Sequence, residues 1–321
     1  MFKFFTKFTI AEITFNLYSD FDARELVYDI QPYNLNVNYL LNLQKESNQI
    51  VNIYIKHSDS RLSINEKFED GLFNYYIEGD YTPMFKKDYN KQFGLFGNKG
   101  TVNRIILHSL EKAGNIILHG CAAISKDKNK VIIGIGSSGS GKSVLTSAAV
   151  ECGWSIVGTE HIIISSNFVL YKGNKIDNAC VQSIEIIKRQ LDKAKIYQDK
   201  IMIEPTAQKV VVDYDSYMME QDKLSLTKLD YQIVIVSFKN SICAKLEEIQ
   251  DNDFLLRMIQ TSASEKICTP IIYDNYILDQ ELNGNPENRS VVINKLINKS
   301  SSNLVIGGDY NNFKKVLNSL A

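Results

Sequence analysis

The chain has 321 residues, 44% of them hydrophobic and 23% charged, an ordinary composition for a folded globular protein with room for about two domains. Its 36 basic and 37 acidic residues leave a formal net charge of −1, which argues against a broad surface for nucleic acid. Five cysteines stand far apart without a C-x-x-C pair, so neither a zinc site nor a disulfide framework is indicated. We therefore expect reduced thiols and a cytoplasmic protein.

Residues 1–98 predict a small, β-rich α+β domain. Two lysines interrupt the apolar N-terminus and no run is long enough to span a bilayer, so we expect neither a signal peptide nor a membrane partner. Alternating or β-branched patterns favour strands, and these lie at 8–17, 50–55 and 72–77. No internal repeat is recognised here. Three glycines within 94–100 mark the boundary to a second domain, residues 99–321.

The second domain alternates predicted helices and strands, which indicates an α/β fold. Its first half predicts a helix at 101–113, strands at 115–124 and 131–135, a helix at 142–152, a strand at 154–164, a hairpin at 168–180 and a helix at 183–193. The polar stretch 194–230 predicts a solvated loop, with a substrate-facing loop as the alternative. The remainder predicts a strand at 231–238 with a partner at 242–249, helices at 251–261 and 287–298, a strand at 304–306 and a helix at 310–320.

Between the apolar segment 131–135 and the helix at 142–152 stands a phosphate-binding loop pattern, G-x-x-x-x-G-K-S. The loop consists of Gly136, Ser137, Ser138, Gly139, Ser140, Gly141, Lys142 and Ser143, and Val144 follows in the helix. Glycine permits the backbone to point its N–H groups at phosphate oxygens, and the helix N-terminus adds partial positive charge. Lys142 can bridge the β- and γ-phosphates, and the Ser143 hydroxyl can bind Mg²⁺. Strand, loop and helix together predict that a nucleotide binds here with Mg²⁺.

The residues on both sides of the loop suggest a family. The chain reads Leu118-His119-Gly120-Cys121-Ala122-Ala123 before the loop and, after it, Gly153-Trp154-Ser155-Ile156-Val157-Gly158-Thr159-Glu160. This order resembles the HPr kinase/phosphorylase superfamily, and it is most similar to the shorter HPr-kinase-related proteins, whose corresponding runs read L-H-A-x-A-V and G-W-x-x-x-S-D-E. The resemblance covers about residues 101–321 and is concentrated in 117–165.

The resemblance implies a kinase core related to phosphoenolpyruvate carboxykinase, in which a hydroxyl accepts the γ-phosphate of ATP. In that family an aspartate after the loop helix acts as base and the next acid assists the metal. Thr159 stands at the base position and Glu160 at the second acid. Threonine cannot accept a proton at neutral pH, so Glu160 or His119 is the candidate replacement. The expected catalytic set is Lys142, Glu160, Thr159 and His119, with Ser143 and Glu160 at the metal.

The first functional hypothesis is an ATP-dependent kinase acting on a hydroxyl of a peptide, a protein or a small metabolite. The alternative, which Thr159 supports, is a catalytically weak nucleotide-binding scaffold or switch in a biosynthetic complex. A third hypothesis is an NTPase of another phosphate-loop family, although the strand at 231–238 does not end in the acid typical of those proteins. The identity of the acceptor and the formation of homo-oligomers stay open.

Overall fold

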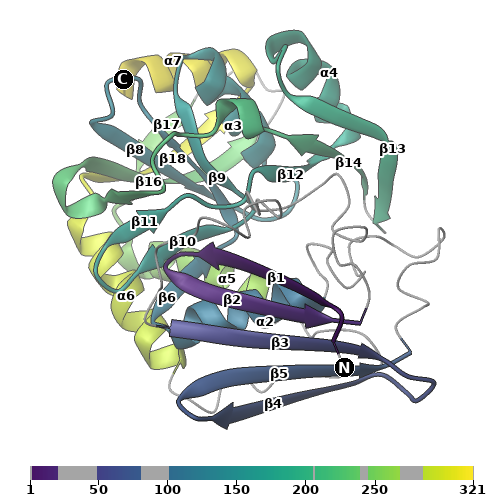
Figure 1. Cartoon of the computed structure of the whole chain (residues 1–321). Helices are drawn as coiled ribbons and strands as arrows, with labels where there is room; N and C mark the ends of the chain where they lie inside the picture. Colours follow the sequence, from purple (N-terminus) through teal and green to yellow (C-terminus); the bar gives the residue numbers. More distant parts are fainter. Residues whose placement is uncertain are drawn as a thin grey trace. The chain divides into compact units, whose positions relative to one another are not determined.

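The computed structural model describes residues 2–20, 49–80, 101–204, 207–238, 245–267 and 285–320. Within these ranges the chain is a mixed α/β protein with four sheets and six α-helices, which confirms the predicted class at that coarse level (Figure 1). It divides into two compact units: of the described residues, those up to Ala113 and Ile267 belong to the first, and those at 114–266 and 285–320 belong to the second. None of the described helices is long and apolar enough to cross a membrane.

The first unit contains a five-stranded sheet in the order β1-β2-β3-β5-β4 and one helix, α2 (Thr101–Lys112). The strands are β1 (Phe4–Ile10), β2 (Ile13–Ser19), β3 (Gln49–His57), β4 (Ser63–Glu69) and β5 (Leu72–Gly79). The three central strands β2, β3 and β5 are parallel, whereas β1 and β4 pair antiparallel at the edges. One sheet face is apolar because alternate residues along each strand are buried.

Helix α2 belongs to the first unit, although the glycine-rich boundary predicts that it begins the second. Polar and aromatic contacts explain the difference. Glu66 on β4 forms ion pairs with His108, at 3.3 Å, and with Lys112. His108 also contacts the ring of Tyr75 edge-on, and the Lys112 ammonium lies 4.5 Å from the centroid of Phe73. These contacts join the helix to the sheet, so the glycines precede the last element of the unit.

The parallel strands of this sheet share a short repeat that the sequence analysis did not recognise. Each carries an apolar residue, Asn, a second apolar residue and Tyr, beginning at Phe15, Val51 and Phe73. The strand register places equivalent positions side by side. The Asn16 amide donates to Asn52 at 3.0 Å, and Asn52 donates to Asn74 at 2.9 Å. The repeat escapes a periodic search because successive asparagines are 36 and 22 residues apart.

The second unit is built on a six-stranded sheet in the order β17-β18-β16-β8-β7-β9. Its strands are β7 (Gly120–Ile124), β8 (Lys130–Ile135), β9 (Ser155–Thr159), β16 (Asp230–Phe238), β17 (Lys245–Glu248) and β18 (Ser302–Gly308). Strands β8, β16 and β18 are parallel, and the other pairings are antiparallel. Strand β17 therefore pairs with β18 and not, as predicted, with the strand at 231–238.

Helices and a second sheet cover the two faces of this six-stranded sheet. Helix α3 (Lys142–Glu151) and helix α7 (Tyr310–Leu320) pack on one face. Helices α5 (Asn252–Ile267) and α6 (Asn285–Lys299) share the opposite core with the smaller sheet (Figure 1). That sheet consists of β6 (Asn115–Leu118), β10 (Ile162–Ser165), β11 (Val169–Tyr171) and β15 (Lys223–Ser225). The predicted helices and strands downstream of residue 230 are thus confirmed in place, apart from the pairing of β17.

The polar stretch 194–230 is predicted as a loop, and this prediction is wrong for 195–204 and 207–213, which are strands. It contains β13 (Lys195–Glu204) and β14 (Ala207–Asp213), which form a three-stranded sheet with β12 (Ile176–Cys180). Helix α4 (Val181–Gln190) packs on that sheet through a core that includes Ile187, Val210 and Val212. The charged residues lie between these apolar positions and hide the strand pattern. The predicted hairpin at 168–180 is also wrong, because β11 and β12 join different sheets.

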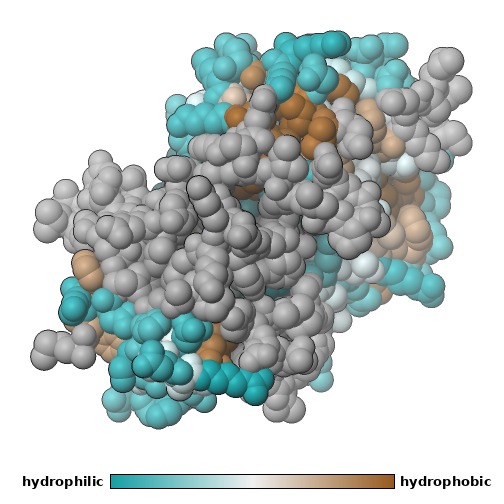
Figure 2. Space-filling view, turned by 90° about the vertical axis from the view of Figure 1, so that its right-hand side faces the viewer, coloured by the Kyte–Doolittle hydropathy of each residue, from teal (hydrophilic) through white to brown (hydrophobic). Residues whose placement is uncertain are grey.

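Several exposed aromatic side chains contact one another in the first unit, because Phe2 and Phe5 both pack on Tyr18 and Phe2 also packs on Tyr54. Among the coloured residues of Figure 2, hydrophilic ones predominate, with hydrophobic patches between them. Exposed large side chains include Phe68 on β4, Val181 on α4 and Phe254 on α5. Single apolar residues of this kind are normal on a folded protein. The polar site at the end of β8 is therefore the better guide to function.

Candidate active site

The phosphate loop occupies the turn between strand β8 and helix α3, as the sequence predicts. Strand β8 lies in the interior of the six-stranded sheet, between β16 and β7, so the loop begins from a rigid base. The end of β16 holds the loop from the side, because the Phe238 N–H donates to the Ser140 carbonyl at 2.7 Å. Helix α3 begins at Lys142 without a side-chain cap or an acidic residue in its first turn. Its N-terminal N–H groups therefore suit an anion.

Gly141 is the glycine on which the loop geometry depends most. Its φ is +101°, in the left-handed region, and it is the N-cap of α3. A Cβ at this position would stand 2.2 Å from the Cβ of Phe238. Both the backbone conformation and the close approach of β16 thus require glycine. The loop is fixed by packing against the neighbouring strand as well as by its own turn.

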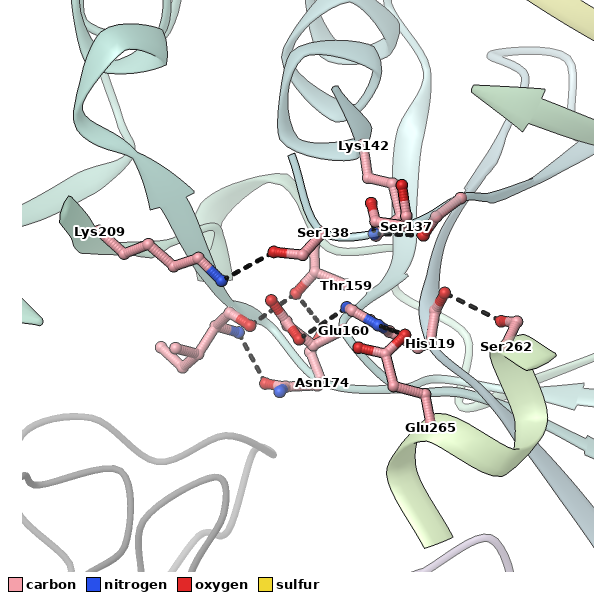
Figure 3. A network of polar contacts seen from close by, with 12 residues as sticks. His119, Ser137, Ser138, Lys142, Thr159, Glu160, Asn174, Lys209, Ser262 and Glu265 are labelled. Atoms are coloured by element: carbon pink, nitrogen blue, oxygen red, sulfur yellow. Dashed lines mark hydrogen bonds and ion pairs between the residues drawn. The ribbon is translucent and has the colours of Figure 1, made fainter. Parts of the chain in front are cut away.

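Lys142 and Lys209 place positive charge at this loop. The Lys142 ammonium donates to the carbonyl oxygens of Gly136 and Ser137 at 2.7 and 3.0 Å. Lys209, from strand β14, donates to the Ser138 hydroxyl at 3.3 Å (Figure 3). Val144 was also predicted to bind the cofactor, but its side chain does not reach the loop, because it is fully buried in the core beneath α3. Its backbone alone is available to the loop.

Two neighbouring chain segments cross from one sheet to the other beside the loop. The stretches 115–124 and 154–164, each predicted as one strand, are each divided into two. Strand β6 pairs with β10 in the small sheet, and β7 pairs with β9 in the large one. His119 lies at the first break and Glu160 at the second, where its φ is +57°. A non-glycine residue in this conformation is uncommon and is found more often at functional sites.

His119 connects two carboxylates from distant parts of the sequence. Its Nε2 lies 3.3 Å from Glu160 Oε2, and its Nδ1 lies 2.6 Å from Glu265 Oε2 on helix α5 (Figure 3). The backbone is held as well, because His119 N–H donates to the Ser262 carbonyl and the Ser262 hydroxyl donates to the His119 carbonyl, both at 3.0 Å. The structure therefore brings His119 and Glu160 together, as required for a shared role. Glu265 was not predicted, since it lies 146 residues from His119.

Thr159 is a structural anchor in this arrangement. Its side chain is buried, and its hydroxyl donates to the carbonyl oxygens of Asn174 and Ile176 at 3.0 and 2.8 Å. Its N–H also donates to the Asn174 carbonyl, at 2.7 Å. An aspartate here would turn a carboxylate toward two carbonyl oxygens. The threonine at the expected base position is thus explained by the segment that it holds, and it is not positioned as a base.

The segment anchored by Thr159 carries an acid that the sequence analysis missed, Asp177 on strand β12. Asp177 is 6% exposed, and burial together with the negative charge of Glu160 raises its pKa to about 6. A hydrogen bond from the Ser143 side chain and the positive charges of Lys142 and His119 act in the opposite direction. Asp177 therefore lies among the loop residues and the His119–Glu160 pair. The only sequence signal was an acid in an otherwise apolar and amide-bearing strand.

The residues present fit a hard divalent cation accompanied by phosphate. Ser143, Asp177 and Glu160 offer hydroxyl and carboxylate oxygens, which Mg²⁺ prefers. The Oδ2 atom of Asp177 is buried without a hydrogen-bond partner in the described part of the chain. In these same residues, no cluster of three or more His, Cys, Asp or Glu side chains could hold a metal alone. A cation bound by one or two carboxylates and by nucleotide phosphates requires no such cluster.

Neither the models of known protein families nor the curated proteins compared with the chain gave a match. The resemblance to HPr-kinase-related proteins therefore rests on the motifs at 117–165. Of the five cysteines, Cys121, Cys152 and Cys180 are free thiols in the structure, and Cys243 and Cys268 lie outside the described residues.

Proposed function

We propose that this protein binds ATP with Mg²⁺ and transfers the γ-phosphate to a hydroxyl group of a peptide, a protein or a small metabolite. The observation that carries the proposal is the meeting of a phosphate loop with buried acids and a histidine at one place. Lys142 and Ser143 come from the loop, and Glu160, His119 and Asp177 come from three other segments. A site that only held phosphate would gain nothing from two nearby carboxylates, which repel it.

Each residue has a distinct role in the proposed transfer. Lys142 and the N-terminus of α3 bind the phosphates and balance their negative charge. Bound Mg²⁺ would neutralise further charge as the phosphoryl group moves. Glu160 accepts the proton of the acceptor hydroxyl while that oxygen bonds to the γ-phosphorus and the bond to the β–γ bridging oxygen breaks, which leaves ADP. His119 then links Glu160 to Glu265, whose side chain is 42% exposed, so ionisable groups lead the proton toward solvent.

The finer fold assignment is part of the same proposal. We infer an HPr kinase/phosphoenolpyruvate carboxykinase-like core, supported by the order of His119, the phosphate loop, Trp154 and Glu160 in the chain. Reduced thiols at Cys121, Cys152 and Cys180 accord with a cytoplasmic location. The acceptor and the oligomeric state are left open by the proposal.

A catalytically weak nucleotide-binding scaffold is the second candidate, and Thr159 is the observation that favours it. The position expected to carry the base is filled by a hydroxyl engaged with two carbonyl oxygens. A scaffold would bind and release nucleotide without transferring phosphate. The two candidates therefore agree on binding and differ on turnover.

Two measurements separate these candidates. Nucleotide affinity is measured by fluorescence titration with a labelled ATP, and transfer by incubating [γ-³²P]ATP with a broad set of peptide and metabolite hydroxyls. We expect Lys142→Ala to weaken binding by about 100-fold or more, whereas Glu160→Gln retains binding and loses about 10²–10⁴-fold in transfer. Lys130→Ala, at the other end of β8, is the control and should resemble the wild type. Tight binding by a wild type that transfers to no acceptor would favour the scaffold.

A further inference from the structure

We propose that Asp177 is the metal-side carboxylate of the phosphate site, a role that the sequence pattern gives to Glu160. The inference rests on the proposed function for the identity of the cation, which is the one that accompanies the nucleotide. The carboxylate that binds the metal would then come from strand β12, and not from the end of strand β9, where the sequence pattern places it. The evidence consists of the position of Asp177, its unpaired oxygen and the contrast with a second buried aspartate in the same sheet.

The position of Asp177 is determined by the anchor at Thr159. Three hydrogen bonds from Thr159 hold the carbonyl groups of Asn174 and Ile176, and the Asn174 side chain accepts from the Ile176 N–H at 2.8 Å. Asp177 is the next residue. Strand β14 holds it from the other side, since Asp177 pairs with Val212. The carboxylate is thus presented by a rigid backbone, as a ligand-binding group must be.

The surroundings of Asp177 would be more favourable for its carboxylate with a cation bound than without one. Ser143, the loop residue expected at the metal, lies close enough to the carboxylate to act against the rise in its pKa. The Oδ2 atom is buried and has no hydrogen-bond partner among the described residues. Glu160 adds a second negative charge nearby. A buried carboxylate with an unsatisfied oxygen and a like charge beside it is costly unless a ligand compensates.

Asp213 shows what a structural aspartate looks like in the same three-stranded sheet. It is also buried, at 5% exposure, and it lies on β14 opposite Ile176. Its carboxylate accepts the N–H of Asp215 at 2.9 Å and lies 3.9 Å from the Lys175 ammonium. Asp213 is therefore neutralised and hydrogen-bonded within the protein. Asp177, one residue along the paired strand, has an Oδ2 atom without a hydrogen-bond partner among the described residues, and Ser143 and Lys142 of the phosphate loop influence its pKa.

In phosphate-loop NTPases, Mg²⁺ is held by the loop Ser or Thr and by an acid from a strand next to the loop strand. Here Ser237 and Phe238, which end the neighbouring strand β16, provide no acid. Asp177 lies near the same Ser143 but belongs to a different sheet. Its oxygens and Ser143 Oγ form a hard oxygen donor set suited to Mg²⁺ or Mn²⁺.

The experiment uses Mn²⁺ as a paramagnetic probe in the full-length protein with a non-hydrolysable ATP analogue. Electron paramagnetic resonance measures free and bound Mn²⁺ for the wild type, Asp177→Asn and the matched control Asp213→Asn. We expect Asp177→Asn to weaken Mn²⁺ binding by about 10–100-fold, and Asp213→Asn to change it by less than about threefold. Binding of the analogue without metal should change by less than about threefold in Asp177→Asn, since the loop is intact.

Unchanged Mn²⁺ affinity in Asp177→Asn would overturn the proposal, and so would a wild type that binds no Mn²⁺ in the presence of the analogue. Circular dichroism shows whether each variant is folded. Ser143→Ala offers a second route: if Ser143 and Asp177 share one cation, the double variant should bind Mn²⁺ little more weakly than the weaker single variant. None of these readouts requires turnover. A protein that binds Mn²⁺ through Asp177 but transfers no phosphate would disprove the kinase and leave the metal assignment standing.

Discussion

The sheet of the first unit and the sheet junction of the second both bury polar side chains, but they treat them differently. In the first, the asparagines of the strand repeat satisfy one another across β2, β3 and β5. In the second, His119, Glu160 and Asp177 bring opposing and like charges together, and Oδ2 of Asp177 has no hydrogen-bond partner among the described residues. Mutually satisfied groups define register at little cost, whereas unsatisfied charge costs stability and marks a site for a ligand.

The largest effect is expected at Gly141, where the loop meets β16. Gly141→Ala would force a Cβ against Phe238 and strain a φ of +101°, so we expect a loss of about 3 kcal/mol or more in stability and no measurable nucleotide binding. Gly139→Ala is the control, because its φ is +79° but nothing lies within 4 Å of the added Cβ. It should cost about 1 kcal/mol. Urea unfolding and nucleotide titration measure both; equal effects would show that contact with β16 is unimportant.

Asp177→Asn should stabilise the metal-free protein even as it weakens metal binding. The native pKa of Asp177, about 6, lies above the ordinary 3.8, so the folded state binds the proton more tightly than the unfolded state. The carboxylate therefore costs stability as pH rises from about 4 to about 6, and the whole cost is present above pH 6. We expect a gain of about 2–3 kcal/mol at pH 7 that disappears near pH 4.

Thermal unfolding of Asp177→Asn across this pH range, in the presence of a chelator, measures the gain as a rise in Tm. Asp213→Asn is the control and should lower Tm, because its carboxylate accepts a backbone N–H and lies near Lys175. A fall in Tm for both variants at pH 7 would mean that Asp177 is a structural group like Asp213.

In the first unit, removing a buried polar side chain should lower the stability of the fold, whereas Asp177→Asn should raise it. Asn52→Ala would deprive both Asn16 and Asn74 of their partner in the ladder, and we expect a loss of about 2 kcal/mol. Lys56→Ala, on the same strand but exposed, should change stability by less than about 0.5 kcal/mol. Urea unfolding of the three proteins tests this. A stable Asn52→Ala would remove the contrast between the two regions.

The smallest effect is expected at Glu66, which joins β4 to helix α2. Burial acts to raise its pKa, but hydrogen bonds from His108 and Lys112 prevail and lower it below the ordinary 4.5. The carboxylate therefore stabilises the fold above about pH 4.5, and this contribution is lost as pH falls through its native pKa. Glu66→Gln should cost about 1 kcal/mol at pH 7, and the cost should shrink as the pH falls through the lowered pKa of Glu66.

The control for this pair is Glu69→Gln, because Glu69 lies 3.9 Å from Lys67 with both side chains about half exposed. Such surface pairs contribute little, so urea unfolding should give nearly wild-type stability. If the two variants behaved alike at pH 7, the ion pairs of Glu66 would not explain why α2 belongs to the first unit.

Much of the fold could be predicted where local pattern and final environment agree. Strand β16, helices α6 and α7 and the phosphate loop follow from apolar periodicity and glycine spacing, which act within a few residues. Strands β13 and β14 were missed because their charged residues obscure the pattern and because α4 supplies the core that they need. The breaks at His119 and Glu160 were missed because strand-favouring apolar residues stand on both sides of each break, and only pairing with two different sheets divides the stretch.

The sequence by itself determined that a loop with the phosphate-binding pattern lies between a buried strand and a helix, since Gly136–Ser143 carries the whole pattern within eight residues. The resemblance to HPr-kinase-related proteins added the expectation that Glu160 and His119 lie near that loop. Only the tertiary structure brought Asp177 to Ser143 and Glu265 to His119, because these residues come from strands and helices whose positions depend on packing between sheets. The same packing explains Thr159, whose hydroxyl serves a backbone segment fifteen residues away.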